Sequence, residues 1–226
     1  MDYPKIIKMD QLTFKFPFSK KYYEQDFFVS SNNFSAYKLV ECWPNWPGKW
    51  LNIFGSKGSG KTHLAKILEK KIDRIKLIEA KNIKNEIIEE LNNLDCLIID
   101  DYNNNINEKL LYSILNQSKQ LENYILINST PSIKNLSFYL EDLKSRIRSF
   151  LFIGIELPTD DLLRVIISKT LSDKQISLNP KLSDFIINNV ERSYEKMFKF
   201  LKDVDELSLS TGKSININLI KKALNQ

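Results

Sequence analysis

Residues 55–62, Gly-Ser-Lys-Gly-Ser-Gly-Lys-Thr, have the G-x-x-x-x-G-K-[ST] spacing of a phosphate-binding loop. Gly58 and Gly60 allow backbone N–H groups to converge on an anion because no Cβ stands in the way. Lys61 can reach the outer phosphates as a point charge, and the Thr62 hydroxyl can ligate a magnesium ion. The spacing therefore predicts that the chain binds a nucleoside diphosphate or triphosphate.

The elements that would hold this loop follow from the hydrophobic pattern around it. The apolar run 50–54 predicts a strand directly before the loop, and the pattern 61–71 predicts a helix directly after it. Further strands are predicted at 75–79, 96–100, 124–127 and 150–155, and helices at 33–42, 82–92, 107–121 and about 139–148. Alternating strands and helices form parallel sheets covered on both faces. We therefore expect an α/β fold of the P-loop NTPase type with a five-stranded parallel sheet.

The strand pattern ends at Leu157-Pro158, and the rest of the chain has only helical patterns. These patterns cover residues 160–172, 180–190, 194–210 and 216–224. We expect a nucleotide-binding core at 26–158 and a small all-α lid at 159–226, preceded by an extended arm at 1–25.

Two acids, Asp100 and Asp101, end the apolar strand that lies about forty residues after the loop. Asp100 is placed to hold Mg²⁺ opposite Thr62, and Asp101 to orient an attacking water. Acids after a strand also occur as ordinary turn residues. The complete phosphate-binding loop favours the functional interpretation.

The strand 124–127 is followed by three small polar residues, Asn128, Ser129 and Thr130. In a parallel sheet the carboxyl ends of the strands meet at the ligand crevice. One of these side chains is therefore a candidate for hydrogen bonding to the γ-phosphate or to the water. The sequence does not choose among them, and capping of the next segment is the alternative role.

Arginines are few in this chain, and Arg146 lies in a predicted helix just before the last strand. A helix end in that place, away from the chain's own loop, suits an arginine finger, which is an arginine supplied to a neighbour's nucleotide. Such a group stabilises the charge of the transition state. The alternative is a surface arginine in an ordinary ion pair.

In this order, the features resemble the AAA+ ATPases, and in detail the DnaA clade with its short Hda-type regulators. The resemblance is carried by Asp26-Phe-Phe-Val-Ser-Ser-Asn32, Gly60-Lys-Thr-His-Leu64 and Asp142-Leu-Lys-Ser-Arg-Ile147. These segments are similar to the clade's adenine-side segment, its P-loop exit and its arginine-finger box. The resemblance spans nearly the whole chain, mostly as pattern rather than identity.

The resemblance implies ADP or ATP, with Mg²⁺, as the ligands. The residues it implies for nucleotide contact are Phe28, Val29, Ser56, Lys57, Gly58, Ser59, Gly60, Lys61, Thr62 and His63. His63 is expected to pack at the start of the helix rather than to act as a base.

The segment Gln11-Leu-Thr-Phe-Lys-Phe16 resembles the hexapeptide with which Hda-type regulators dock on the DNA sliding clamp. Leu12, Phe14 and Phe16 are apolar anchors that can enter a groove. Gln11 can fix the register of the peptide by hydrogen bonds. The alternative is an arm that packs on its own domain.

The resemblance implies a function in the control of chromosome replication. A clamp-docked regulator of this type presents its arginine finger to ATP held by DnaA, and hydrolysis leaves DnaA in its inactive ADP form. DnaA and the DNA polymerase III sliding clamp (beta subunit) are the expected partners, and a homo-dimer is left open. The alternative is a helicase loader similar to DnaC, with its own ATPase activity.

Two departures from the family pattern bear on the chain's own hydrolysis. Glu195 stands where the family's lid helix carries a nucleotide-sensing arginine, and Asp101 replaces the usual glutamate. Both favour an ATPase activity that is weak at most. The residues expected to face the lid core are Met197, Phe198, Leu201 and Val204.

Composition adds several exclusions. The net charge of +5 is spread along the chain without a Lys/Arg block, and the chain ends at Gln226, so we expect no strong DNA binding and no helix-turn-helix domain. No signal peptide or membrane-length apolar run occurs, which favours a cytoplasmic protein, and the resemblance implies association with the replisome. Cys42 and Cys96 lack metal-ligand spacing, and Cys96 is expected to be a packed free thiol.

Three tryptophans, Trp43, Trp46 and Trp50, are interspersed with prolines. Aromatic residues in this arrangement are expected to pack a loop onto the edge of the sheet. A protein-docking surface is the alternative.

Overall fold

The computed structural model describes residues 24–173, 176, 178–212 and 214–224. These residues form two compact units, and each is described by itself. The larger unit contains the described residues up to Leu162 together with Ser193–Glu195, and the smaller unit contains the other described residues. The predicted nucleotide-binding motifs all lie in the larger unit.

A five-stranded sheet forms the centre of the larger unit, with the strand order β2-β3-β4-β1-β5. The strands are β1 (Trp50–Gly55), β2 (Ile75–Glu79), β3 (Cys96–Tyr102), β4 (Tyr124–Ser129) and β5 (Leu151–Ile155). Every neighbouring pair is parallel. The predicted parallel sheet is therefore confirmed, and β1, which leads into the phosphate-binding loop, lies between β4 and β5.

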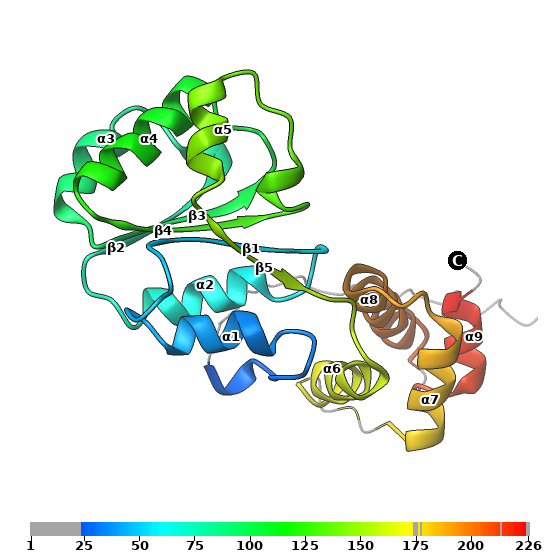
Figure 1. Ribbon diagram of the computed structural model, residues 1–226. Helices are drawn as coiled ribbons and strands as arrows, with labels where there is room; N and C mark the ends of the chain where they lie inside the picture. The colour runs from blue at the N-terminus through cyan, green and yellow to red at the C-terminus, as the bar shows by residue number, and fades with distance from the viewer. Residues whose placement is uncertain (1–23, 174–175, 177, 213, 225–226) are drawn as a thin grey trace, which may run out of the picture. The chain divides into compact units, whose positions relative to one another are not determined.

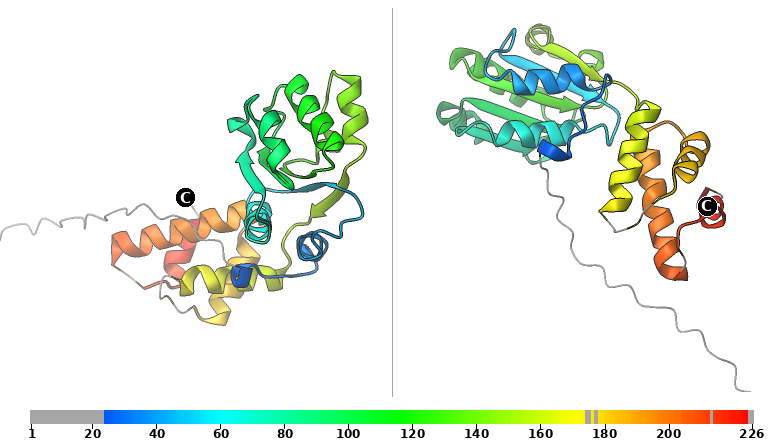
Figure 2. Two further views of the ribbon diagram at one scale, coloured as in Figure 1. Left: turned by 90° about the vertical axis from the view of Figure 1, so that its left-hand side faces the viewer. Right: turned by 90° about the horizontal axis from the view of Figure 1, so that it is seen from below.

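Helices cover both faces of this sheet (Figure 1). They are η1 (Glu24–Asp26), α1 (Phe34–Glu41), α2 (Lys61–Glu69), α3 (Ile87–Glu90), α4 (Glu108–Gln120) and α5 (Glu141–Ile147). The view from below in Figure 2 shows α1 and α2 on one face, and α3, α4 and α5 lie on the other. The strands are therefore buried on both sides, as their nearly continuous apolar sequences require.

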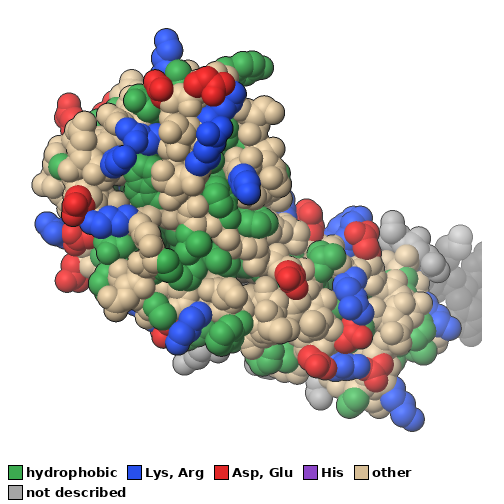
Figure 3. Space-filling model, viewed as in Figure 1, with side chains coloured by type: hydrophobic (Ala, Val, Ile, Leu, Met, Phe, Trp, Pro, Cys, Tyr) green, Lys and Arg blue, Asp and Glu red, His purple; other side chains and the backbone are tan. Residues whose placement is uncertain are grey.

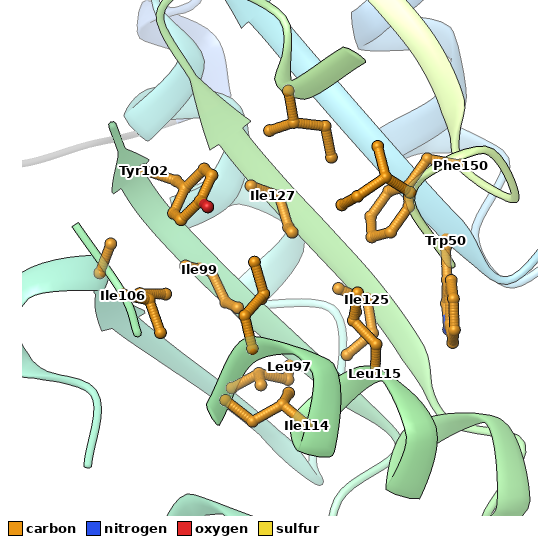
Figure 4. Packing of buried hydrophobic residues seen from close by; sticks show 14 of the residues in the cluster. Trp50, Leu97, Ile99, Tyr102, Ile106, Ile114, Leu115, Ile125, Ile127 and Phe150 are labelled. Atoms are coloured by element: carbon orange, nitrogen blue, oxygen red, sulfur yellow. The ribbon is translucent and has the colours of Figure 1, made fainter. Parts of the chain in front are cut away.

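Two hydrophobic clusters fill the space between the sheet and the two helical layers. Because side chains alternate along a strand, successive residues of β3 enter different clusters. Leu97 and Ile99 join the cluster under α4, whereas Cys96 and Ile98 join the one over α2. Figure 4 shows Ile114 of α4 over Leu97 in the first cluster. Cys96 is fully buried as a free thiol, so that prediction is confirmed.

The tryptophans pack as expected. Trp43 and Trp46 meet edge to face, with ring centroids 5.2 Å apart, and Trp43 lies 4.3 Å from the ring of Tyr124 at the start of β4. Trp50 packs 5.3 Å from the ring of Phe150. Because Trp46 and Trp50 are nearly inaccessible to solvent, these rings join a loop to the sheet rather than form a docking surface.

The helix predicted at 82–92 is wrong in extent. Only Ile87–Glu90 is α-helical, between the 3₁₀ turns η2 (Ala80–Asn82) and η3 (Leu91–Asn93). Ile83, Ile87 and Leu91 recur at helical spacing, but Ile83 has an extended backbone with ψ of 130°. Asparagine favours turns over helix interiors, and the neighbouring asparagines shorten the helix.

In its described residues the smaller unit is helical, with one hydrophobic core. Its helices are α6 (Asp160–Ser172), α7 (Pro180–Asn189), α8 (Tyr194–Thr211) and α9 (Ile217–Leu224). Met197, Leu201 and Val204 are buried as predicted, whereas Phe198 is 41% exposed and Phe200 is buried in its place. Phe200 fits the three-to-four spacing of one helix face, and Phe198 does not.

None of the helices in the described ranges is both long enough and apolar enough to cross a membrane.

Candidate functional site

The phosphate-binding loop joins the end of β1 to the first turn of α2. Gly58 and Gly60 both have positive φ, 83° and 97°, and Gly60 is the N-cap of α2. A Cβ on Gly60 would lie 2.9 Å from the ring of Phe27, so space as well as backbone conformation requires glycine there. The turn leaves the N-terminus of α2, with its unpaired N–H groups, open toward an anion.

Lys61 curls over this loop. Its Nζ donates to the carbonyl oxygens of Gly55 at 2.8 Å and Ser56 at 3.1 Å. Burial lowers the pKa of the Lys61 amine, while the negative charges of Asp100 and Asp101 act in the opposite direction. The ammonium group is thus partly removed from water at the point where phosphate oxygens would enter, which is where a charge-assisted hydrogen bond is strong.

Asp100 is the centre of a hydrogen-bonded group that joins three elements. The Thr62 hydroxyl of α2 donates to Asp100 Oδ2 at 2.8 Å, and Asn128 Nδ2 of β4 donates to Asp100 Oδ1 at 2.8 Å. Asn128 Nδ2 also donates to the backbone oxygen of Lys61 at 3.0 Å. Because Asp100 is only 6% exposed, these donors stabilise a carboxylate that water hardly reaches.

The ligand set at Thr62 and Asp100 fits magnesium. A hydroxyl and a carboxylate are the hard oxygen ligands that Mg²⁺ prefers, and this ion usually completes its shell with water and substrate phosphates. No cluster of three or more His, Cys, Asp or Glu that could hold a metal was found in the described ranges. The Thr62 and Asp100 oxygens therefore fit an ion whose ligand shell a nucleotide and water would complete.

Asp101 lies beside this group in a different setting. The β3–β4 register shifts between Ile99 and Tyr102, and within this irregularity Asp101 has a φ of 54° and is exposed, whereas Asp100 is buried. The hydrogen bond and charge of Glu79 raise the pKa of Lys81, with a smaller contribution from the charge of Asp101. The Asp101 charge also opposes the lowering of the Lys61 pKa by burial. The two acids therefore do different things: one is bonded inside the site, and the other presents its carboxylate to solvent at the rim.

The structure separates the three polar residues after β4. Asn128 bonds Asp100, as described above. Ser129 accepts a hydrogen bond from Asn52 Nδ2 at 2.9 Å, and Thr130 Oγ1 donates to the Gly55 oxygen at 2.6 Å. Asn128 is also fully buried, and its Oδ1 has no hydrogen-bond partner among the described residues. Asn128 therefore faces the acid, Ser129 faces the sheet interior, and Thr130 touches the start of the loop.

Asn52 supports this region and was missed by the sequence reasoning. Its side chain is fully buried in β1 and donates to Ile127 O at 2.8 Å as well as to Ser129. Its Oδ1 accepts from Ser132 Oγ at 3.2 Å and Ile133 N at 3.1 Å. A polar residue inside an otherwise apolar strand was the available signal, because buried amides are almost always hydrogen-bonded.

The segment before α1 lies against the loop through Phe27. The Phe27 ring meets His63 edge to face at 5.3 Å and stacks on Tyr37 at 5.8 Å. Phe28 is 47% exposed, and Val29 is partly buried. His63 therefore makes the aromatic contact expected of packing at the helix start.

Two asparagines that the sequence reasoning did not select hold this segment in place. Asn33 donates to Phe28 O at 2.9 Å and accepts from Ser30 N at 2.9 Å. Asn32 donates to the oxygen of Leu157, just after β5. The segment is thus tied both to its own turn and to the end of the sheet.

The remaining loop residues differ in exposure. The hydroxyl oxygens of Ser56 and Ser59 are buried and have no hydrogen-bond partner in the described part of the chain. The Lys57 side chain is 82% exposed, and its Nζ lies 3.7 Å from a Glu195 carboxylate oxygen, which belongs to the same unit. At this exposure the pair contributes little to stability.

Arg146 is not part of this constellation. It lies on α5, across the sheet from α2, and is partly buried. Its Nη2 donates to Asn116 Oδ1 at 2.8 Å, and within the described ranges it forms no ion pair. The alternative prediction of an ordinary surface ion pair therefore does not hold for these residues.

The candidate docking residues Gln11, Leu12, Phe14 and Phe16 lie outside the described residues.

Comparison with known proteins places this fold. A family profile described as "Hda, lid domain" matches residues 160–224, and one described as "RNA helicase" matches residues 51–140. The chromosomal replication initiator protein DnaA of Buchnera aphidicola subsp. Cinara cedri is 25% identical over 235 residues, covering 92% of this chain. This chain is similar to DnaA-clade AAA+ proteins, and its C-terminal part resembles the lid of Hda.

Solved DnaA structures have the same fold. Domain III of the Thermotoga maritima replication initiation protein DnaA has a TM-score of 0.75 at 21% identity, and the match covers 93% of this chain and 98% of that one. AMPPCP-bound DnaA from Aquifex aeolicus has a TM-score of 0.66 at 23% identity and covers 86% of this chain and 68% of that one.

The DnaA relatives are matched over only part of their own length. The chain spans about half the length of its DnaA relatives, 53% for the Buchnera protein. An uncharacterized protein of Haemophilus influenzae is 25% identical over 185 residues, which cover 76% of this chain and 80% of that protein.

Proposed function

We propose that this chain is an Hda-like regulator of chromosomal replication initiation. In this proposal it binds ADP or ATP with Mg²⁺, docks on the DNA sliding clamp in the cytoplasm, and stimulates hydrolysis of ATP held by DnaA. Its own ATPase activity is weak at most. The resemblance of the lid to the Hda family and of the whole chain to DnaA supports this class of function.

The observation that carries the proposal is the state of Arg146. Its guanidinium group is hydrogen-bonded to a neutral amide, and no described carboxylate neutralises its charge. Two other arginines of the chain do form pairs, Arg74 with Asp95 and Arg164 with Asp184. A positive charge kept on a short helix, across the sheet from the chain's own loop, suits a group that completes another molecule's nucleotide site.

In the chain's own site, the loop backbone and Lys61 would hold the phosphates, and Thr62 with Asp100 would hold the magnesium ion. Asn128 would accept a hydrogen bond from the attacking water through its Oδ1, with Thr130 as the second candidate for contact with the outer phosphate. Asp101 would be a rim carboxylate for orienting water. Phe28 and Val29 would lie on the adenine side. Bound nucleotide would mainly order these elements, because Glu195 replaces the sensing arginine of the lid.

In the partner's site, water attacks the γ-phosphorus of DnaA-bound ATP, the bond to the β-phosphate oxygen breaks, and ADP and inorganic phosphate form. Arg146 would donate hydrogen bonds to the γ-phosphate oxygens and the leaving oxygen as their charge changes. Such a contact contributes about 10³–10⁵ in rate in related phosphoryl transfers.

The decisive experiment measures hydrolysis of radiolabelled ATP on DnaA, with the clamp on DNA, in the presence of the Arg146→Ala variant. We expect stimulation to fall by about 10³, while nucleotide and clamp binding by the variant stay unchanged. Arg148→Ala is the matched control, since Arg148 is an exposed arginine two residues away. Full stimulation by Arg146→Ala would refute the proposed function.

Clamp docking is tested separately, by pull-down of the unmodified chain and a Gln11→Ala/Leu12→Ala variant on the sliding clamp. We expect the double substitution to abolish capture, because it removes the register hydrogen bonds and one apolar anchor. Equal capture of the two chains would exclude residues 11–16 as the docking peptide.

The assembled Thr62–Asp100–Asn128 group favours a second candidate, an ATPase of the helicase-loader type. That candidate predicts appreciable turnover by the isolated chain, increased by single-stranded DNA and lost in Lys61→Ala. Turnover no faster than that of the Lys61→Ala variant would exclude it.

A further inference from the structure

Helix α5, which carries Arg146, is too short to fix a side chain by itself. It has seven residues, and helices of this length are marginal without tertiary contacts. Leu143 and Ile147 anchor one face of α5 in the hydrophobic cluster that α4 also enters. The direction of its polar residues must therefore be set by neighbouring elements.

Helix α4 contacts α5 at both ends. The carboxylate of Glu108, the first residue of α4, accepts hydrogen bonds from Tyr139 N at 2.9 Å and Leu140 N at 2.8 Å. Two turns later, Asn116 Oδ1 accepts the 2.8 Å bond from Arg146 Nη2. One helix thus holds the backbone at the entry of α5 and a side chain near its end.

The chemistry of the second contact is unusual for this chain. Arg74 and Arg164 each donate through Nε and Nη2 to an aspartate, which neutralises their charge. Arg146 donates one N–H to an uncharged amide, and its Nε is buried without a partner among the described residues. An amide can therefore orient the guanidinium group without cancelling its charge.

We infer that Asn116 is a positioning residue for Arg146, and this inference rests on the proposed function. Asn116 holds one guanidinium nitrogen through a neutral amide, so the position of the guanidinium group is fixed while its charge is kept. Positioning of this kind lowers the entropy that a partner's transition state would otherwise have to remove from a flexible arginine. The side chains over α4 and α5 in Figure 3 include both basic and acidic groups.

The inference predicts that the stability of the chain and its stimulation of the partner can change separately. A purely structural hydrogen bond would make the two change together. A carboxylate at position 116 would accept the same bond more strongly, so the stability of the chain should be kept or increased. The same carboxylate would neutralise Arg146, so stimulation of the partner should fall. If the contact were only structural, stimulation would follow stability.

The test uses the full chain with clamp and ATP-loaded DnaA, and compares Asn116→Ala, Asn116→Asp and the matched control Gln117→Asp. Maximal hydrolysis rate, the chain concentration giving half of it, and the thermal unfolding midpoint are measured for each. For Asn116→Ala we expect about a tenfold lower maximal rate with an unchanged half-maximal concentration, as for one lost hydrogen bond in the transition state.

For Asn116→Asp we expect at least the same tenfold loss with an unchanged or higher midpoint, and for Gln117→Asp no loss. Full maximal rate in Asn116→Ala, or stimulation by Asn116→Asp equal to that of the unmodified chain, would overturn the inference. If Arg146→Ala stimulates fully, the proposed function itself fails. If Arg146→Ala is inactive and Asn116→Ala is fully active, only the positioning role fails.

Discussion

The phosphate-binding loop and helix α5 place opposite surroundings around their positively charged side chains. Around the loop, Lys61 is covered by two carbonyl oxygens and lies in the field of Asp100 and Asp101. On α5, Arg146 meets a neutral amide and no described acid. In a site that binds a ligand, acids of the same chain can partly neutralise the positive charge. An arginine that acts on another molecule must instead keep its positive charge. This difference supports a chain that binds nucleotide in one place and acts on a partner from another.

The largest expected effect is a loss of nucleotide affinity when Lys61, but not Arg146, is replaced by alanine. Lys61→Ala should weaken nucleotide binding by the chain about 10³-fold, because about two charge-assisted hydrogen bonds to phosphate are lost. Isothermal titration with ADP and ATP measures this change. Lys57→Ala, a change at the highly exposed loop lysine, is the control and should alter affinity little. Arg146→Ala should leave affinity unchanged; a similar loss in that variant would erase the distinction between the two regions.

A smaller effect is expected when the balance around Asp100 is disturbed. Asn128→Asp replaces the amide that donates to Asp100 with a second buried acid, so the free energy of unfolding at neutral pH should fall by about 3 kcal/mol. The pKa of the introduced carboxyl is raised above its unfolded value by its neighbour. Its protonated form therefore favours the folded state, and the loss should grow as pH rises from 5 to 8.

Urea unfolding at the two pH values measures this difference. Asn128→Ala is the control, because it removes the donor without adding charge and should show no such pH dependence. An equal loss at both pH values in Asn128→Asp would contradict the described contact with Asp100.

The smallest of these effects concerns the support beneath the site. Asn52→Ala removes a fully buried amide that makes four hydrogen bonds, and it should lower the free energy of unfolding by about 2 kcal/mol. Nucleotide affinity should change less than in Lys61→Ala, since Asn52 acts through the segment after β4. Denaturant unfolding and titration measure the two quantities. Asn103→Ala, at an exposed turn, is the control. Unchanged stability in Asn52→Ala would show that the buried network is not needed.

The sheet and most helices could be predicted because each is encoded locally. Strands such as 75–79 are short apolar runs, and helix α4 has a clear helical period, so neither needed distant information. The prediction of one helix at 82–92 was wrong because its isoleucines have helical spacing in the sequence. They enter the core from a backbone that alternates between 3₁₀ turns, an extended residue and a short α-helix. The prediction that Phe198 faces the core of the smaller unit was wrong, because one step along a helix turns a side chain by about 100° and moves it out of the core.

The site was predicted as a set of motifs but not as a set of contacts. Which of Asn128, Ser129 and Thr130 faces Asp100 depends on the alternation of β4 and on the register shift of β3 beside it. The packing of Phe27 against the loop was not predicted, because neighbouring aromatic residues look alike until the backbone turns one of them toward the loop. Asn116 lies thirty residues from Arg146, so nothing local marks it as that arginine's partner.

The buried thiol of Cys96 provides a chemical probe for opening of the larger unit. Burial raises the pKa of this thiol far above its usual range, so an alkylating reagent should react with it only in molecules whose sheet has separated from α2. Cys42, which is partly exposed, should react early in the same sample. The difference between the alkylation rates of Cys42 and Cys96 would then measure how often the larger unit opens. Slower alkylation of Cys96 in the presence of ADP would report nucleotide binding without any engineered probe.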